Sequence, residues 1–197
     1  ILIGLVGSEM CIRDSCNTAT AVAAKELRET YDLPILGMEP ALKPAHALRH
    51  GGSILVLATP MTLRLEKFQQ LYARYGEGAI PLPCPGLMEL VEQEANEQAR
   101  RYLLELLHPY DLRTVDAVVL GCTHYVFLRP LLREILPENV QVLDGNEGTA
   151  RQLRRVLTEN DLLCARETPG KITLETSGAP ETVLPVMQRL LVRADTL

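Results

Sequence analysis

The sequence predicts an α/β fold in which helices cover both faces of parallel sheets. Short segments such as residues 54–58 and 115–120 are almost entirely apolar, and longer segments of helical pattern separate them. Strands of a parallel sheet are apolar throughout because both of their faces are buried. An alternation of such strands with helices is typical of α/β proteins.

The expected elements alternate from residue 18 to residue 192. Strands are expected at residues 33–38, 54–58, 79–82, 115–120, 140–143 and 172–175. Helices are expected at residues 18–31, 41–49, 61–75, 87–107, 125–136, 147–159 and 181–192. Pro137 ends the helix expected at 125–136, because proline lacks the backbone N–H that a continuing helix needs.

Composition and charge exclude several classes of partner. The 197 residues are 47% apolar and carry a net charge of −5, without a block of Lys or Arg. Neither a nucleic acid nor an anionic membrane surface is therefore expected as a partner. No apolar run reaches the roughly 18 residues of a bilayer-spanning helix. A small acidic substrate remains compatible, because backbone amides and helix N-termini can hold a carboxylate.

The cysteines indicate free thiols in a reducing compartment, and so a cytoplasmic location. Their number is odd, their spacing is wide, and no C-x-x-C pair occurs, which disfavours a disulfide framework and a zinc site. The histidines show no metal-ligand spacing either, so no metal is expected. The cysteines are Cys11, Cys16, Cys84, Cys122 and Cys164.

Residues 1–15 (ILIGLVGSEMCIRDS) are expected to be non-native sequence. They lack the charged first region of a secretory signal. They resemble a translated sequencing-adapter read instead. On this interpretation Cys11 and Asp14 have no role, and the chain proper begins near Cys16.

Two cysteines occupy positions that can activate a thiol. Cys122 follows the strand expected at 115–120 and opens a helical segment, and Cys16 precedes the helix expected at 18–31. Ligands of open parallel sheets gather at the carboxyl ends of strands, and a helix N-terminus lowers a thiol's pKa. Most single cysteines are nevertheless inert core residues, and Cys84 and Cys164 are assigned to that class.

The neighbouring polar residues each have a plain structural explanation as well. Asn17, Thr18 and Thr123 can be helix caps, or their side chains can hold a carboxylate and an ammonium. His124 is either a partly buried polar residue or a group that exchanges a proton with Cys122. Nucleotide-binding and serine-hydrolase glycine motifs are absent from the sequence. The residues alone therefore indicate an α/β protein with one or two activated cysteines.

Several segments resemble the glutamate racemases, within the wider aspartate/glutamate racemase superfamily. The resemblance rests on two cysteine motifs in order, with a functional glutamate, Glu92, between them. The matching segments are residues 16–19 (CNTA), 37–41 (GMEPA), 58–62 (ATPMT), 82–92 (LPCPGLMELVE) and 120–125 (LGCTHY).

The resemblance implies two pseudo-symmetric parallel-sheet units of flavodoxin-like type, with the active site in the cleft between them. Residues 1–38 and 145–197 would form the first unit, which would be incomplete at its N-terminal side. Residues 39–144 would form the second unit. The family also leaves room for a homodimer.

The resemblance further implies cofactor-independent interconversion of L- and D-glutamate, which supplies the D-isomer for peptidoglycan. Cys16 and Cys122 would act on opposite faces of the substrate Cα, and Glu92 and His124 would assist Cys122. No pyridoxal, nicotinamide or metal is implied. The implied substrate-binding residues are Asn17, Thr18, Thr59, Thr62, Thr123 and His124.

Three alternatives remain at this point. A relative within the superfamily could act on aspartate, a hydantoin or a malonate instead of glutamate. A non-catalytic fragment or paralogue would have the same fold without turnover. A cysteine hydrolase using Cys122 and His124 is disfavoured, because residues so close in the chain rarely reach nucleophile–base geometry.

Overall fold

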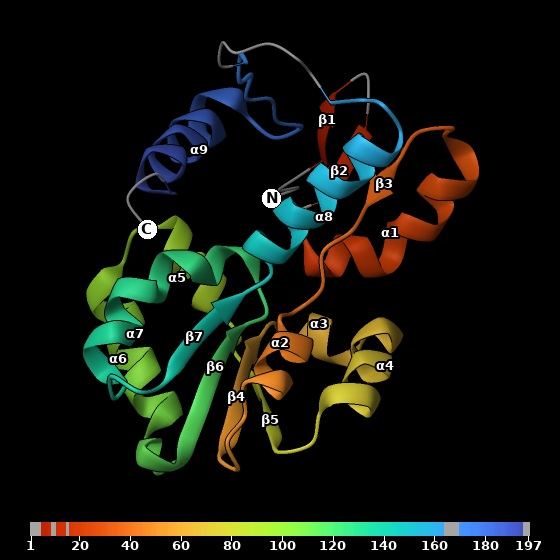
Figure 1. Cartoon of the computed structure of the whole chain (residues 1–197). Helices are drawn as coiled ribbons and strands as arrows, with labels where there is room; N and C mark the ends of the chain where they lie inside the picture. Colours follow the sequence, from red (N-terminus) through yellow and green to blue (C-terminus); the bar gives the residue numbers. More distant parts are fainter. Residues whose placement is uncertain (1–4, 9–10, 15, 164–169, 195–197) are drawn as a thin grey trace.

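The structure is a computed structural model that describes residues 5–8, 11–14, 16–163 and 170–194. It contains two sheets (Figure 1). The smaller sheet has the order β1-β2-β3, with β1 antiparallel to β2 and β2 parallel to β3. Its strands are β1 (Leu5–Ser8), β2 (Cys11–Asp14) and β3 (Ile35–Leu36).

The larger sheet has four parallel strands in the order β5-β4-β6-β7. These are β4 (Ser53–Ala58), β5 (Ala79–Pro83), β6 (Val115–Leu120) and β7 (Gln141–Asp144). The predicted α/β class with parallel strands is confirmed.

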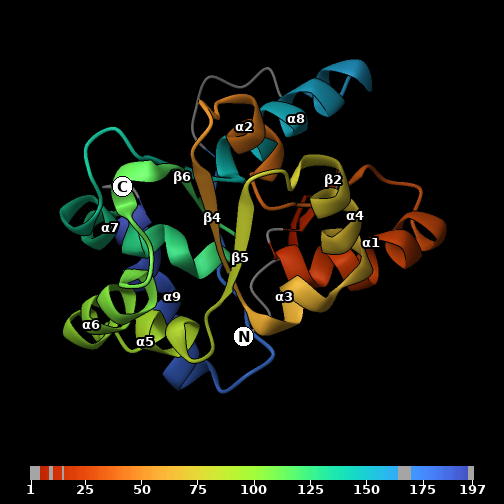
Figure 2. The same ribbon diagram turned by 90° about the horizontal axis from the view of Figure 1, so that it is seen from below.

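Both faces of the larger sheet are buried, as its apolar strands predict. Leu55 and Leu57 of β4 pack on one face with side chains of α5 (Leu87–Glu92), α6 (Asn96–Leu107) and α7 (Arg129–Ile135). Ile54 and Val56 alternate with them and pack on the opposite face, with α2 (Leu42–Ala47) and α4 (Glu66–Tyr75). Figure 2 shows these two helical layers on either side of β4. Successive side chains of a strand point to opposite faces, which explains the division.

Three of the expected helices are divided. Residues 61–75 form α3 (Pro60–Arg64) and α4, separated by Leu65 in an extended conformation. Residues 87–107 form α5 and α6, separated at Glu94, whose φ is 54°. The helix expected at 125–136 is divided into a 3₁₀ helix, η2 (Thr123–Leu128), and α7. A shorter 3₁₀ helix, η1 (Leu112–Thr114), precedes β6.

The remaining helices are α1 (Asn17–Thr30), α8 (Asn146–Glu159) and α9 (Pro180–Ala194). After β3 the chain passes to the larger sheet, and after β7 it returns through Gly145 to α8, which packs against β3. A Cβ at Gly145 would lie 2.8 Å from the carbonyl oxygen of Glu39. The outgoing and returning segments are therefore in close contact, and glycine is required there.

One predicted strand is absent from the described residues. Residues 172–175 form no strand, and Ile172 is 69% exposed, because a short β-prone segment needs a neighbouring strand and a face to bury. Within residues 1–15, β2 pairs with β3 and its Cys11 side chain is buried, and the non-native origin of this segment stays a prediction. Cys164 lies outside the described residues. In the part of the chain that the structure describes, no helix is long and apolar enough to cross a membrane.

Candidate active site

Cys16 and Cys122 each follow a strand and precede a helix. Cys16 follows β2 and occupies the N-cap position of α1, and β6 leads through Gly121 to Cys122, which occupies the N-cap position of η2. Gly121 N–H donates to the Leu57 carbonyl at 2.7 Å, and a Cβ at Gly121 would lie 2.9 Å from that oxygen. Glycine therefore lets the segment before Cys122 run close against β4.

The side chain of Asn17 joins the two cysteine segments. Its Nδ2 donates a 2.9 Å hydrogen bond to the carbonyl oxygen of Gly121, a contact between residues 104 positions apart. Asn17 is buried, so this bond is shielded from water. The two thiols are near enough that Cys16 contributes to raising the pKa of Cys122. The structure thus brings the two predicted cysteines into one region.

Glu92, His124 and Cys122 form a chain of polar contacts. Glu92 Oε1 lies 2.9 Å from His124 Nε2, and His124 Nδ1 lies 3.7 Å from Cys122 Sγ. Burial lowers the pKa of His124, against the opposing effect of the Glu92 carboxylate. A neutral imidazole that donates Nε2–H to Glu92 leaves Nδ1 as an acceptor toward the thiol. The three residues can therefore move a proton to and from Cys122.

The expectation that the helix N-terminus favours the Cys122 thiolate is wrong. Burial is the largest effect and raises the pKa of Cys122 to about 12, although backbone N–H groups of His124 and Tyr125 oppose it. Cys122 is only 9% exposed, so its thiolate loses the solvation that water would give. Cys122 therefore rests as a neutral thiol.

Three of the predicted threonines form one hydroxyl cluster. Thr62 Oγ1 lies 2.9 Å from Thr18 Oγ1 and 2.9 Å from Thr59 Oγ1. Thr59 also caps α3 by accepting the Thr62 N–H at 3.2 Å. The half-buried Thr123 lies outside this cluster, beside Cys122. Asn17 and Thr18 do not cap α1, because the cap position belongs to Cys16.

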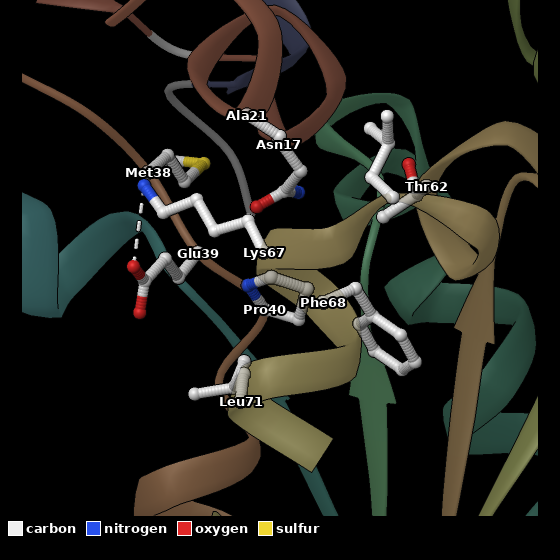
Figure 3. A pocket seen from close by; sticks show the side chains of 10 residues that line it. Asn17, Ala21, Met38, Glu39, Pro40, Thr62, Lys67, Phe68 and Leu71 are labelled. Atoms are coloured by element: carbon white, nitrogen blue, oxygen red, sulfur yellow. Dashed lines mark ion pairs between the residues drawn. The ribbon is translucent and has the colours of Figure 1, made fainter. Parts of the chain in front are cut away.

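A small cavity of about 10 Å³ adjoins Asn17 and Thr62 (Figure 3). A cavity of this size has room for about one water molecule. Within the described residues, Asn17 Oδ1 has no hydrogen-bond partner. Lys67 lines the same cavity and lies 3.2 Å from Glu39. Lys67 was not predicted, since its place depends on how α4 packs against the segment after β3.

Cys84 fits its assignment as an inert core residue. It is 1% exposed, its thiol donates to the Leu82 carbonyl at 3.3 Å, and burial raises its pKa to about 12. None of the four cysteines within the described ranges forms a disulfide. No group of three or more Asp, Glu, His or Cys side chains suited to a metal ion occurs in those same ranges.

The fold and site define an α/β protein in which two cysteines follow strands of different sheets and the residues beside them are joined by a hydrogen bond. The chain belongs to the Asp/Glu/Hydantoin racemase family, whose model matches residues 11–153.

The chain is similar in sequence to glutamate racemases of two bacteria. It is 43% identical to that of Clostridium perfringens over 182 residues, which cover 90% of this chain and 70% of the relative. It is 46% identical to that of Bifidobacterium adolescentis over 186 residues, which cover 91% and 72%.

Solved structures agree with this likeness. A glutamate racemase of Escherichia coli, in complex with L-glutamate and the activator UDP-MurNAc-Ala, superposes with a TM-score of 0.72 at 34% identity. The match covers 90% of this chain and 69% of that one. A glutamate racemase isoform of Bacillus anthracis gives a TM-score of 0.76 at 26% identity, covering 91% and 69%.

Proposed function

We propose that this protein interconverts L- and D-glutamate without a cofactor, with Cys16 and Cys122 as the two proton-transferring groups. The observation that carries the proposal is the Asn17–Gly121 hydrogen bond, which ties the residue after Cys16 to the residue before Cys122. The similarity to glutamate racemases over about nine-tenths of the chain supports the choice of substrate.

Inversion at Cα requires one group on each face of the substrate. A thiolate removes the Cα proton and becomes a thiol, and the opposite thiol donates its proton to Cα and becomes a thiolate. A single base cannot reach both faces of a substrate held in place, so two are needed. Fixed hydrogen-bond donors stabilise the carbanion between the two transfers.

His124 and Glu92 serve Cys122 in this mechanism. Because burial raises the pKa of Cys122 to about 12, the thiol is a weak acid and needs a partner to accept its proton. His124 Nδ1, at 3.7 Å, is the acceptor, and Glu92 orients the ring through Nε2. General acid–base help of this kind typically contributes about 10²–10⁴-fold to a rate.

The polar residues around the two thiols bind the substrate. The side-chain oxygen of Asn17, Oδ1, can accept a hydrogen bond from the substrate ammonium, while its Nδ2 stays bonded to the Gly121 carbonyl. The hydroxyls of Thr18, Thr59, Thr62 and Thr123 are assigned to the carboxylates, with His124 beside them.

We extend the proposal to organisation and setting. Residues 1–38 with 145–197 form one unit and residues 39–144 the other, with the substrate between them. The enzyme acts in the cytoplasm, where free thiols persist, and supplies D-glutamate for peptidoglycan. A homodimer is compatible with this arrangement.

Incubation with single enantiomers in D₂O tests the proposal. L-glutamate should lose its Cα–H signal in the proton spectrum and yield D-glutamate, whereas L-aspartate and a hydantoin should not react. The family name covers all three substrates, so faster turnover of aspartate or the hydantoin would reassign the specificity. Absence of exchange with all three would favour a non-catalytic fragment or paralogue.

A further inference from the structure

Helix α9 forms ion pairs with the turn that ends α5. None of its residues is buried, and one side of the helix is half-buried through Val183, Leu184, Val186, Met187 and Leu190. Arg189 Nε donates to Glu94 Oε2 at 2.8 Å, and Arg193 Nη1 lies 3.6 Å from Glu94 Oε1. Figures 1 and 2 both show α9 beside α5. Two arginines of α9 therefore converge on one carboxylate.

The contacts of α9 fall on the two segments that carry Glu92 and His124. Glu94 comes two residues after Glu92, in the turn that ends α5. The Arg193 guanidinium lies 5.5 Å from the ring centre of Phe127, which follows His124 by three residues in η2. Helix α9 thus contacts both the turn after Glu92 and the 3₁₀ helix η2 that carries His124.

The arginines of α9 contact this turn at its left-handed residue, Glu94. Glu94 has φ 54°, a left-handed conformation that a residue with a Cβ rarely adopts. Its backbone is held by bonds from Glu94 N–H to the Val91 carbonyl at 3.1 Å and from Ala95 N–H to the Leu90 carbonyl at 2.9 Å. Glu92 is the last residue of α5, so the turn at Glu94 directly follows the residue that bonds His124.

We propose that Arg189 and Arg193 are positioning residues, which hold Glu92 against His124 by fixing Glu94 and Phe127. The inference rests on the proposed function, in which His124 Nδ1 accepts the Cys122 proton. Glu92 favours the tautomer with the proton on Nε2, because its Oε1 lies 2.9 Å from that nitrogen and accepts its hydrogen bond. The Glu92 side chain is already 20% exposed, and loosening the turn lets water compete for its carboxylate.

The test compares the whole chain with its Arg189→Ala/Arg193→Ala variant. Nitrogen-15 spectra of the His124 ring, assigned by their loss in His124→Asn, should show Nε2 protonated in the original protein. The variant should show both tautomers. The kcat for glutamate should fall roughly tenfold, part of what general acid–base catalysis contributes, with KM within about twofold.

Arg100→Ala/Arg155→Ala is the matched control. It also removes two arginines, each paired with a glutamate, at 3.8 Å for Glu134 and 3.9 Å for Glu159. It should leave the ring spectrum and kcat unchanged. Glu94→Gln removes the carboxylate that both arginines contact and should reproduce the tautomer mixture. It therefore tests the same contact even if the arginine variant fails to fold.

The spectra need no turnover, so this test is separate from that of the proposed function. An original protein that leaves glutamate unchanged would contradict the proposed function, while the tautomers would still report on the positioning of Glu92. Identical ring spectra in the original protein and in Glu94→Gln would overturn the inference. So would an unchanged kcat in an active arginine variant whose tautomers had mixed.

Discussion

Asn17 Nδ2 donates a 2.9 Å hydrogen bond to the carbonyl oxygen of Gly121, so the two cysteine segments are joined directly through one side chain. The bond links α1 with the end of β6. Both partners stand next to a cysteine, Cys16 on one side and Cys122 on the other. The buried carboxamide of Asn17 therefore ties the segment that carries Cys16 to the segment that carries Cys122.

Replacing Asn17 with Ala should separate the two segments and weaken the fold. The Gly121 carbonyl would lose its buried donor, which costs roughly 1–3 kcal/mol. Urea unfolding should show that loss, and racemisation should fall by more than the change in stability explains. Asn160→Ala is a suitable control, since the Asn160 amide bonds only the Val156 carbonyl at an exposed helix end. Equal activity in the two variants would contradict the role given to Asn17.

Cys16→Ala and Cys122→Ala should each abolish racemisation. Each removes the group that serves one face of Cα, so the rate should fall by at least roughly 10²-fold, the lower end of general acid–base effects. Cys84→Ala should keep its activity, because that thiol is held in the core by the Leu82 carbonyl. The change in optical rotation of a glutamate solution measures the racemisation rate of each of the three variants. Substantial racemisation by either active-site variant would refute the two-thiol mechanism.

The pH profile should reflect the neutral form of His124. Burial lowers the pKa of His124, so the acidic limb of kcat/KM should lie below the ordinary imidazole value of about 6.5. The Glu92 carboxylate raises that pKa by stabilising the imidazolium. Glu92→Gln should therefore move the acidic limb to still lower pH, even if the maximal kcat/KM also falls.

His108→Asn provides the control for this profile, because His108 is exposed on the far end of α6 from the site residues. It should leave the limb in place. A limb that moves to higher pH in Glu92→Gln would mean that the carboxylate does not stabilise the charged ring.

Much of the fold could be predicted because its signals are local. Strands β4 and β6 agree with the predicted segments to within one residue, since an apolar run buried on both faces is visible in the sequence. The break at Leu65 was not predicted, because leucine favours helix and no glycine or proline marks the site. The strand expected at 172–175 failed for the opposite reason: its residues suit a strand, but no strand in the described part of the chain pairs with them.

The site could be predicted as a set of residues, but its contacts could not. The cysteine motifs identify Cys16 and Cys122, whereas the bond from Asn17 to Gly121 spans 104 positions and depends on how two sheets meet. The pKa of Cys122 was predicted in the wrong direction. A helix N-terminus can be read from sequence, but the depth of burial that outweighs it becomes visible only in the fold.

Substitution by alanine should have opposite effects on the free energy of unfolding at two glycines, Gly121 and Gly148. At Gly121 a Cβ would lie 2.9 Å from both the Ala58 Cβ and the Leu57 carbonyl oxygen, and neither the backbone nor the buried strand can yield easily. Gly121→Ala should therefore lower the free energy of unfolding by roughly 1–3 kcal/mol and displace Cys122, reducing racemisation as well. At Gly148 in α8 nothing lies within 4 Å of the added carbon, so Gly148→Ala should raise stability by roughly 0.5 kcal/mol. Urea unfolding of the two variants distinguishes these signs, and a stable, fully active Gly121→Ala would show that the close approach to β4 is not needed.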